Sequence, residues 1–287
     1  MIPTLLKRLP FHAQTLHLFV KSDYKTTIAP ITLFAIAAAP DLQVSHIWHT
    51  IAWVWLHILH FDVANQIVGV EEDRKNKGDR PIPAGRISAA DATILRWLLV
   101  PICLSYSFCY SIQTFWASFL LSILTIFYNE LGAHAGVWVL RNCTNALGFA
   151  AFEMGATLIA SDRRRLDYTA LCSMIISAGI LATTYQAQDL KDIHGDRAVG
   201  RHTLPIVLPK VARPSILLGL AAWSMALAVV WKLDPVTGLA FMAVGFFTGY
   251  RFMACKSVPD DQISFYWYNF WISCVHALPG YYRHFYM

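Results

Sequence analysis

Charged side chains are scarce in this chain: Asp, Glu, Lys and Arg make up 14% of its 287 residues, whereas 56% are hydrophobic. A water-soluble domain would carry about 25% charged residues. The apolar excess extends along the whole chain, which excludes an ordinary soluble domain and indicates an integral membrane protein. The formal net charge of +5 is modest and comes from basic loops, so we expect the lipid bilayer as a partner and no nucleic acid.

The chain also lacks a domain linker, a low-complexity stretch and a short-period repeat, and no cleavable signal peptide is recognisable before Lys25. Its six cysteines fall almost entirely in apolar segments without the spacing of metal ligands. Buried free thiols are therefore favoured over disulfides or a zinc site. We expect a single domain over residues 1–287.

Apolar segments long enough to cross a bilayer recur along the chain. A spanning helix needs about 20 mostly apolar residues. The sequence predicts an all-α bundle of about nine such helices, of which the first is short and bounded by Pro30 and Pro40. The predicted spans are residues 26–40, 46–68, 91–111, 114–132, 135–160, 167–188, 211–232, 236–254 and 263–282.

Two long polar connections, residues 70–90 and 189–210, interrupt this series of spans. Most Lys and Arg residues fall on the side of the membrane that holds the N-terminus and both connections. The positive-inside rule therefore places these segments in the cytoplasm, although the triplet at residues 163–165 falls on the other side.

The second connection begins with a cluster of acidic residues. Asp189, Asp192 and Asp196 stand at i, i+3 and i+7, which puts their carboxylates on one face of a helix. Placing carboxylates at the end of a membrane helix costs free energy, so their presence there indicates a functional role. Mg²⁺ commonly joins one or two carboxylates to substrate phosphate oxygens. Lys191 and Arg197 in the same run can contact those phosphates directly.

Residues 65–86 form a second segment that combines acidic and basic residues, although its acidic pattern is weaker than that of residues 189–196. This segment leaves an apolar helix at Asn65, contains the acidic run 71–73 and ends in the basic loop Arg80-Pro-Ile-Pro-Ala-Gly-Arg86. Two acidic helix ends on one side of the membrane predict a metal–diphosphate site between them. The alternative is two solvated loops with ordinary charge pairs.

The run Asp189-Leu-Lys-Asp-Ile-His-Gly-Asp196 resembles the second aspartate-rich motif of the UbiA superfamily of intramembrane prenyltransferases, and residues 65–86 resemble the first. The resemblance covers most of the chain. It implies one UbiA-like transmembrane domain around a central cavity, in which Mg²⁺ holds a prenyl diphosphate (C15 or C20) that ionises to an allylic cation. The implied metal ligands are Asp73, Glu72, Asp189, Asp192 and Asp196, with Lys191 beside them, and the implied diphosphate-binding residues are Asn65, Arg80, Arg86, Tyr128, Asn142, Asn145 and Arg197.

The first motif departs from the family pattern Asn-Asp-x-x-Asp-x-x-x-Asp, because Gln66 and Gly69 stand where two carboxylates are usual. Glu72, almost on the helical face of Asn65, is a candidate replacement ligand. The basic residue that the family tends to place after the tyrosine ending the fourth helix is also missing after Tyr128. Such losses resemble the fungal UbiA-type terpene cyclases of secondary metabolism, which fold the prenyl chain on itself. The resemblance implies an enzyme of the endoplasmic reticulum membrane, and prenyl transfer to an aromatic or other small acceptor is the alternative.

Three buried ionisable residues need separate interpretations. Glu153 lies deep in the fifth predicted span, where it could act as the base that ends a cation cascade. A neutral acid bonded to another helix is the plainer interpretation. His57 and His60 could bind a metal, yet buried hydrogen-bonded histidines are more common.

A transporter is a different class of function that the sequence must be weighed against. The charges, however, gather at one face of the membrane and are sparse through its midplane, which argues against a transporter.

Overall fold

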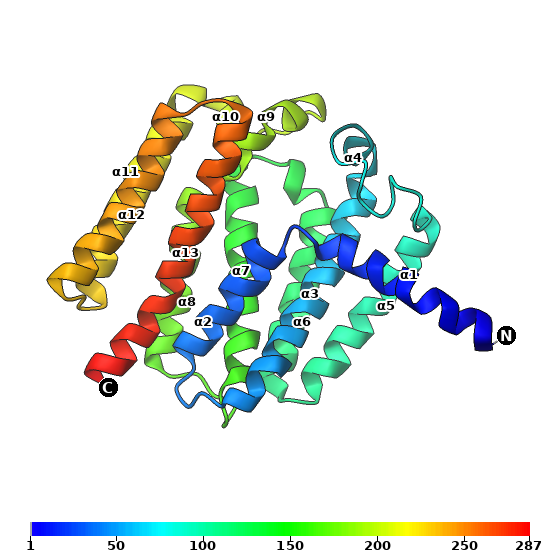
Figure 1. Cartoon of the computed structure of the whole chain (residues 1–287), viewed down its shortest axis with the longest axis horizontal. Helices are drawn as coiled ribbons and strands as arrows, with labels where there is room; N and C mark the ends of the chain where they lie inside the picture. Colours follow the sequence, from blue (N-terminus) through cyan, green and yellow to red (C-terminus); the bar gives the residue numbers. More distant parts are fainter. Residues whose placement is uncertain (1) are drawn as a thin grey trace.

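The computed structural model describes residues 2–287, apart from the side chains of residues 2–8, 75 and 76. Over this range the regular structure is helical, with two isolated β-bridges and no strand, so the predicted all-α class is confirmed (Figure 1). The helices of the bundle are α2 (Ala29–Ala38), α3 (Ile47–Val68), α5 (Ala89–Phe108), α6 (Ile112–Asn129), α7 (Trp138–Ala160), α8 (Tyr168–Thr184), α11 (Pro209–Val230), α12 (Pro235–Ala254) and α13 (Val258–Tyr286).

Shorter helices and turns connect these long helices. In Figure 1, α4 and α9 lie at the same end of the bundle, and α1 extends away from its side. The helix α1 is not among the predicted spans, because its charged and histidine residues make it too polar for one. The connecting elements are α1 (Ile2–Val20), the π-helical turn η1 (Tyr24–Ile28), α4 (Val70–Asn76), α9 (Asp189–Ala198), α10 (Leu204–Val207) and the 3₁₀ turns η2 (Val44–His46), η3 (Ala133–Ala135) and η4 (Tyr185–Ala187).

Among the described residues, six helices are both long and apolar enough to cross a bilayer: α5, α6, α7, α8 with its η4 extension, α11 and α12. The segment formed by η1 and α2 is apolar but shorter. Helices α3 and α13 contain 22 and 29 residues. At 1.5 Å per residue they are long enough for a hydrocarbon core of about 30 Å, although polar side chains lower their mean hydropathy. These segments are compatible with the predicted spans and with an integral membrane protein.

Polar groups inside the bundle are joined across helices. His57 Nε2 lies 2.7 Å from Ser118 Oγ on α6, and its Nδ1 lies 2.8 Å from the carbonyl oxygen of Trp53. His60 contacts the buried guanidinium of Arg96 on α5. Both histidines therefore have hydrogen-bonding partners, as expected of buried histidines that pack helices together. The six cysteines are all free, and Cys103 alone is fully buried.

Candidate active site

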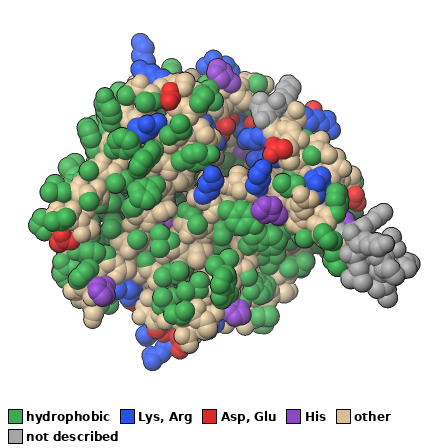
Figure 2. Space-filling view, viewed as in Figure 1, with side chains coloured by type: hydrophobic (Ala, Val, Ile, Leu, Met, Phe, Trp, Pro, Cys, Tyr) green, Lys and Arg blue, Asp and Glu red, His purple; other side chains and the backbone are tan. Residues whose placement is uncertain are grey.

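A cavity of about 510 Å³ opens at the end of the bundle where α4 and α9 lie. Figure 2 shows Lys, Arg, Asp and Glu side chains gathered around a hollow in the upper part of the molecule. Both acidic motifs and the start of η1 contribute to the wall. Its charged lining comprises Lys21, Asp23, Lys25, Asp62, Glu72, Asp73, Lys77, Asp79, Arg80, Arg141, Lys191, Asp192, Asp196 and Arg201.

The first acidic motif is presented by a break in the helix that precedes it. The expectation that Glu72 continues the face of Asn65 along one helix is wrong in detail, because α3 ends at Val68 and α4 begins at Val70. Gly69, at φ −89° and ψ 11°, separates the two helices. A Cβ at this position would lie 3.2 Å from the carbonyl oxygen of Asn65, a tight contact that glycine avoids. Even so, the cavity wall includes Asn65, Glu72 and Asp73 together.

The second acidic motif starts a new helix. The turn η4 separates α8 from α9, so Asp189 and Asp192 lie in the first turn of α9, where the helix dipole favours negative charge. Asp192 and Asp196 line the cavity, whereas Asp189 is 1% exposed and pairs with Arg141 of α7. Burial raises the pKa of Asp189 to about 6 against the opposing effect of Arg141.

Arginine and lysine side chains neutralise these carboxylates in pairs. Arg80 Nη1 donates to both oxygens of Asp73, at 2.8 and 2.7 Å. Lys191 Nζ lies 2.9 Å from Asp192 Oδ2. Burial by itself would raise the pKa of Asp192, but Lys191 and other nearby cations hold it below its usual value. The structure thus brings Asp73, Arg80, Lys191 and Asp192 to one cavity, as the sequence motifs suggest.

Arg201 connects the two acidic motifs. Its guanidinium lies 3.1 Å from Glu72 Oε2 on α4 and donates to Asp196 Oδ1 on α9 at 2.8 Å. Gly200, at φ 73°, adopts the left-handed conformation that ends α9, and the Arg201 N–H donates to the Asp196 carbonyl oxygen at 2.9 Å. This helix ending turns the chain back on itself and directs the Arg201 side chain toward the cavity.

The donor chemistry of the cavity fits Mg²⁺. Carboxylate oxygens are the preferred ligands of this hard cation. Among the described residues, Asp189 Oδ2 and Asp196 Oδ2 are buried without a hydrogen-bond partner, and a bound cation would satisfy such atoms. Within the same residues no three His, Cys, Asp or Glu side chains already converge in a metal-binding arrangement, and Asp73, Asp189, Asp192 and Asp196 each pair with an arginine or lysine.

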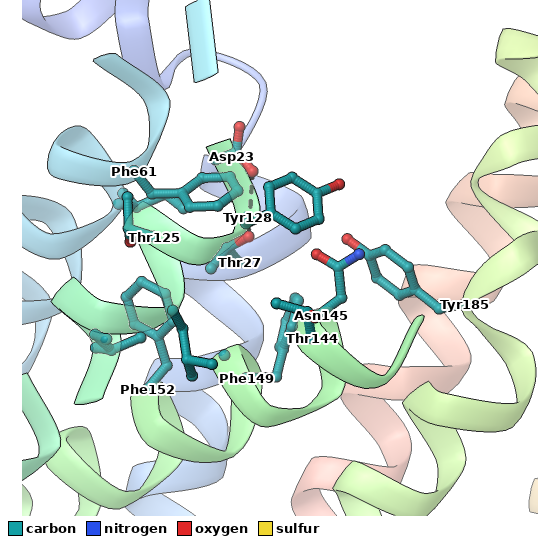
Figure 3. Close-up of a pocket in the computed structure, with 14 residues that line it drawn as sticks. Asp23, Thr27, Phe61, Thr125, Tyr128, Thr144, Asn145, Phe149, Phe152 and Tyr185 are labelled. Carbon is teal, nitrogen blue, oxygen red and sulfur yellow. Dashed lines mark hydrogen bonds between the residues drawn. The ribbon is translucent and has the colours of Figure 1, made fainter. Parts of the chain in front are cut away.

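A smaller apolar pocket of about 80 Å³ adjoins the cavity inside the bundle (Figure 3). The rings of Phe61, Phe149 and Phe152 line it, together with Tyr128 and Tyr185. Aromatic faces at such a position can stabilise a carbocation by about 2 kcal/mol each when water is excluded. The residues common to both spaces are Asp23, Thr27, Phe61, Tyr128, Asn145, Phe149 and Tyr185.

Three residues that the resemblance assigns to diphosphate binding are not part of the cavity wall. Arg86 faces α1, where its Nη2 donates to Gln14 Oε1 at 2.8 Å and its guanidinium lies over the ring of Phe11. Arg197 is exposed on α9. Asn142 is buried and donates to Gln186 Oε1 at 3.2 Å, one helical turn away from Asn145, which does line the cavity.

Glu153 lies outside both spaces, in a polar cluster between helices. Ser177 Oγ donates to Glu153 Oε1 at 2.5 Å, and His276 Nε2 lies 3.3 Å from the same oxygen. His276 Nδ1 in turn lies 3.0 Å from the carbonyl oxygen of Pro30. The cluster joins α7, α8, α13 and α2. This arrangement favours an acid hydrogen-bonded between helices over a base that ends a cation cascade.

Several charged residues of the wall were not predicted from the sequence, among them Asp23, Arg141 and Arg201. Arg141 precedes Asn145 by one helical turn, and this shared helical face was a usable signal. Arg201 and Asp23 belong to no helical repeat with the acidic motifs, so no spacing rule points to them.

The chain matches the model of the UbiA prenyltransferase family over residues 27–274. It is 33% identical over 270 residues to the fumagillin beta-trans-bergamotene synthase of Aspergillus fumigatus, covering 93% of this chain and 91% of that protein. It is 30% identical over 261 residues to the diterpene cyclase eriG of Hericium erinaceus, covering 86% and 81%.

A solved structure of a UbiA homologue from Archaeoglobus fulgidus, bound to DMAPP and Mg²⁺, has the same fold. It matches with a TM-score of 0.73 at 15% identity, over 93% of this chain and 97% of that one. The family match includes both acidic motifs and the part of the cavity wall that follows residue 26. The chain therefore belongs to the UbiA prenyltransferase family.

Proposed function

We propose that this protein is a membrane-embedded terpene cyclase, which uses Mg²⁺ to ionise a C15 or C20 prenyl diphosphate and then closes the chain on itself. The observation that carries the proposal is that a cavity lined by two acidic motifs shares part of its wall with an aromatic pocket inside the bundle. The names of the Aspergillus and Hericium relatives, a synthase and a cyclase, support cyclisation.

Ionisation breaks the bond between the allylic carbon and the diphosphate oxygen, and the bonding electrons leave with the diphosphate. Asp73, Glu72, Asp192 and Asp196, with Asp189 behind them, would hold Mg²⁺, which when bound neutralises charge on the leaving group. Lys191, Arg80 and Arg201 add positive charge around the same space. Asn65, Tyr128 and Asn145 supply hydrogen-bonding groups to the wall.

The hydrocarbon chain would occupy the aromatic pocket and the inner part of the cavity. A closed apolar environment keeps water away from the allylic cation, so a double bond of the same chain attacks it first. The faces of Phe61, Phe149 and Phe152 stabilise the positive charge as it moves along the chain. Loss of a proton from the cyclised cation then gives a neutral hydrocarbon.

We also propose that the cavity faces the cytoplasm from the endoplasmic reticulum membrane. The support is the concentration of Lys and Arg in residues 70–90 and 189–210. Protease cleavage within residues 70–90 in sealed right-side-out microsomes tests this orientation, and full protection there would contradict it.

Purified protein given Mg²⁺ and a C15 or C20 prenyl diphosphate, without an acceptor, is expected to release diphosphate together with a cyclic hydrocarbon. A cyclase needs no second substrate, because the nucleophile is a double bond of the same chain. Diphosphate release and gas chromatography of the extract measure the two products.

Omitting Mg²⁺ from this assay should stop both products. If the protein forms no product without an acceptor but forms a prenylated product when an aromatic acceptor is added, its function is prenyl transfer and not cyclisation. Release of linear alcohol alone would also contradict a cyclase, because it shows that water captures the cation.

Glu72→Gln is expected to lower the rate at limiting Mg²⁺ by about tenfold, since a charge-assisted interaction contributes about 1.5 kcal/mol or more. Glu72 is 13% exposed and pairs with Arg201 at the cavity, whereas the adjacent Glu71 is 76% exposed and pairs with Arg74. Glu71→Gln is therefore the matched control and should keep the wild-type Mg²⁺ dependence. Equal tolerance at both positions would remove Glu72 from the proposed metal site.

A further inference from the structure

The aromatic pocket has one charged side chain in its wall, Asp23, among the described residues. The other lining groups are apolar rings and chains, hydroxyls and one amide. Figure 3 shows Asp23 beside the rings of Phe61 and Tyr128, at the edge of the pocket. Asp23 also lines the larger charged cavity, so its carboxylate lies where the two spaces meet.

Three hydroxyl groups fix the orientation of this carboxylate. Oδ1 accepts hydrogen bonds from Thr26 Oγ1 at 3.1 Å and Thr27 Oγ1 at 3.2 Å, and Oδ2 accepts one from Ser22 Oγ at 2.8 Å. The carboxylate makes no capping bond to a backbone N–H of η1. Its bonding partners are therefore side chains of its own turn, and they orient the group without neutralising its charge.

The π-helical turn η1 produces this arrangement. The Asp23 carbonyl oxygen accepts from the N–H groups of both Thr27 at 3.0 Å and Ile28 at 2.8 Å, and the second is the wider π-helical bond. Pro30 lies in the first turn of α2, two residues beyond η1, and has no N–H to donate, so the regular hydrogen-bond ladder of an α-helix is interrupted in this region. Single π-helical turns of this kind occur frequently at functional sites.

We infer that Asp23 is a catalytic residue, the base that ends cyclisation by accepting a proton from the cyclised carbocation. The inference rests on the proposed function. A carbon next to the cationic carbon loses its proton to an Asp23 oxygen, and the electrons of that C–H bond form the new double bond. The cation is thereby neutralised, and the proton on Asp23 passes to water in the charged cavity that the same residue lines.

Position distinguishes Asp23 from the other carboxylates. Asp192, Asp196 and Asp73 line the charged cavity but not the aromatic pocket, so they face the diphosphate end. Glu153, which the sequence offers as one possible base, lines neither space, and its Oε1 is engaged by Ser177 and His276. Asp23 is the carboxylate that a folded hydrocarbon chain in the pocket can contact.

The test is Asp23→Asn in the full-length protein, which keeps the shape of the side chain and removes its basicity. With Mg²⁺ and C15 or C20 prenyl diphosphate, we expect diphosphate release to stay within about threefold of wild type, because ionisation takes place elsewhere. Formation of the wild-type cyclic hydrocarbon should fall by about 100-fold, with alcohols and other alkenes in its place. Asp23→Glu, which retains a carboxylate, should restore a large part of the cyclic product.

Asp91→Asn is the matched control, because Asp91 is an exposed aspartate that also accepts a serine hydroxyl hydrogen bond, from Ser88, and lies outside both spaces. An unchanged product mixture in Asp23→Asn overturns the inference while leaving the proposed function standing. A parallel loss of diphosphate release and product would also overturn it, because Asp23 would then act in ionisation or folding. A changed product mixture in Glu153→Gln but not in Asp23→Asn would assign the proton removal to Glu153. Wild-type protein that releases no diphosphate without an acceptor overturns the proposed function itself.

Discussion

Asp192→Ala is expected to lower turnover of the prenyl diphosphate by about 1,000-fold or more, because a lost metal ligand removes several kcal/mol of charge stabilisation. Asp192 lines the cavity from the first turn of α9 and pairs with Lys191 at its side. The measurement is diphosphate release by purified protein at saturating Mg²⁺. Asp91→Ala is the control, since Asp91 occupies the first turn of α5 and is exposed.

The variant Asp189→Asn tests the ion pair between Asp189 and Arg141 separately from metal binding at Asp192. Asp189 is nearly fully buried, and removing its charge leaves the Arg141 guanidinium inside the protein without its partner. A thermal unfolding midpoint measured beside activity shows whether folding is lost. Near-normal turnover in folded Asp192→Ala protein would disprove the assignment of α9 as the metal-binding helix.

Arg201→Ala is expected to reduce turnover by about 10- to 100-fold, whereas Arg197→Ala should stay close to wild type. Arg201 pairs with both Glu72 and Asp196, and hydrogen bonds to charged groups contribute about 1.5–3 kcal/mol. Its loss removes positive charge beside the diphosphate and separates the two acidic motifs. Arg197 has the same charge on the same helix but is exposed.

The comparison of these two arginines uses diphosphate release at a fixed Mg²⁺ concentration, so that only the side-chain position differs. A larger loss at Arg197 than at Arg201 would show that the end of α9 rearranges when substrate binds. Arg201→Lys adds a second control, since lysine keeps the charge but cannot reproduce the paired contacts of a guanidinium.

The membrane bundle was predictable from the sequence because a bilayer imposes length and polarity on each helix separately. For example, the predicted span 114–132 overlaps α6, and the predicted span 236–254 nearly coincides with α12. The end of the second span at residue 68 was predicted, but the helical face expected to join Asn65 and Glu72 was not kept, because α4 begins a new helix after Gly69. The helix α1 was also missed, since an element that does not cross the bilayer need not be apolar throughout.

Within the active site, the sequence determined which helix ends carry the carboxylates, because the i, i+3, i+7 spacing fixes a shared helical face wherever the helix lies. Asp192 and Asp196 could therefore be expected together, and the resemblance of residues 65–86 to the first motif added Asp73, whereas Asp189 of the same spacing does not line the cavity. Only the tertiary structure decided which cations meet them. Arg197 and Arg201 follow Asp196 closely, and the left-handed turn at Gly200 directs Arg201 inward while Arg197 stays exposed. Asp23 reaches the pocket through η1, which depends on the packing of distant segments, so nothing in its local sequence marks it.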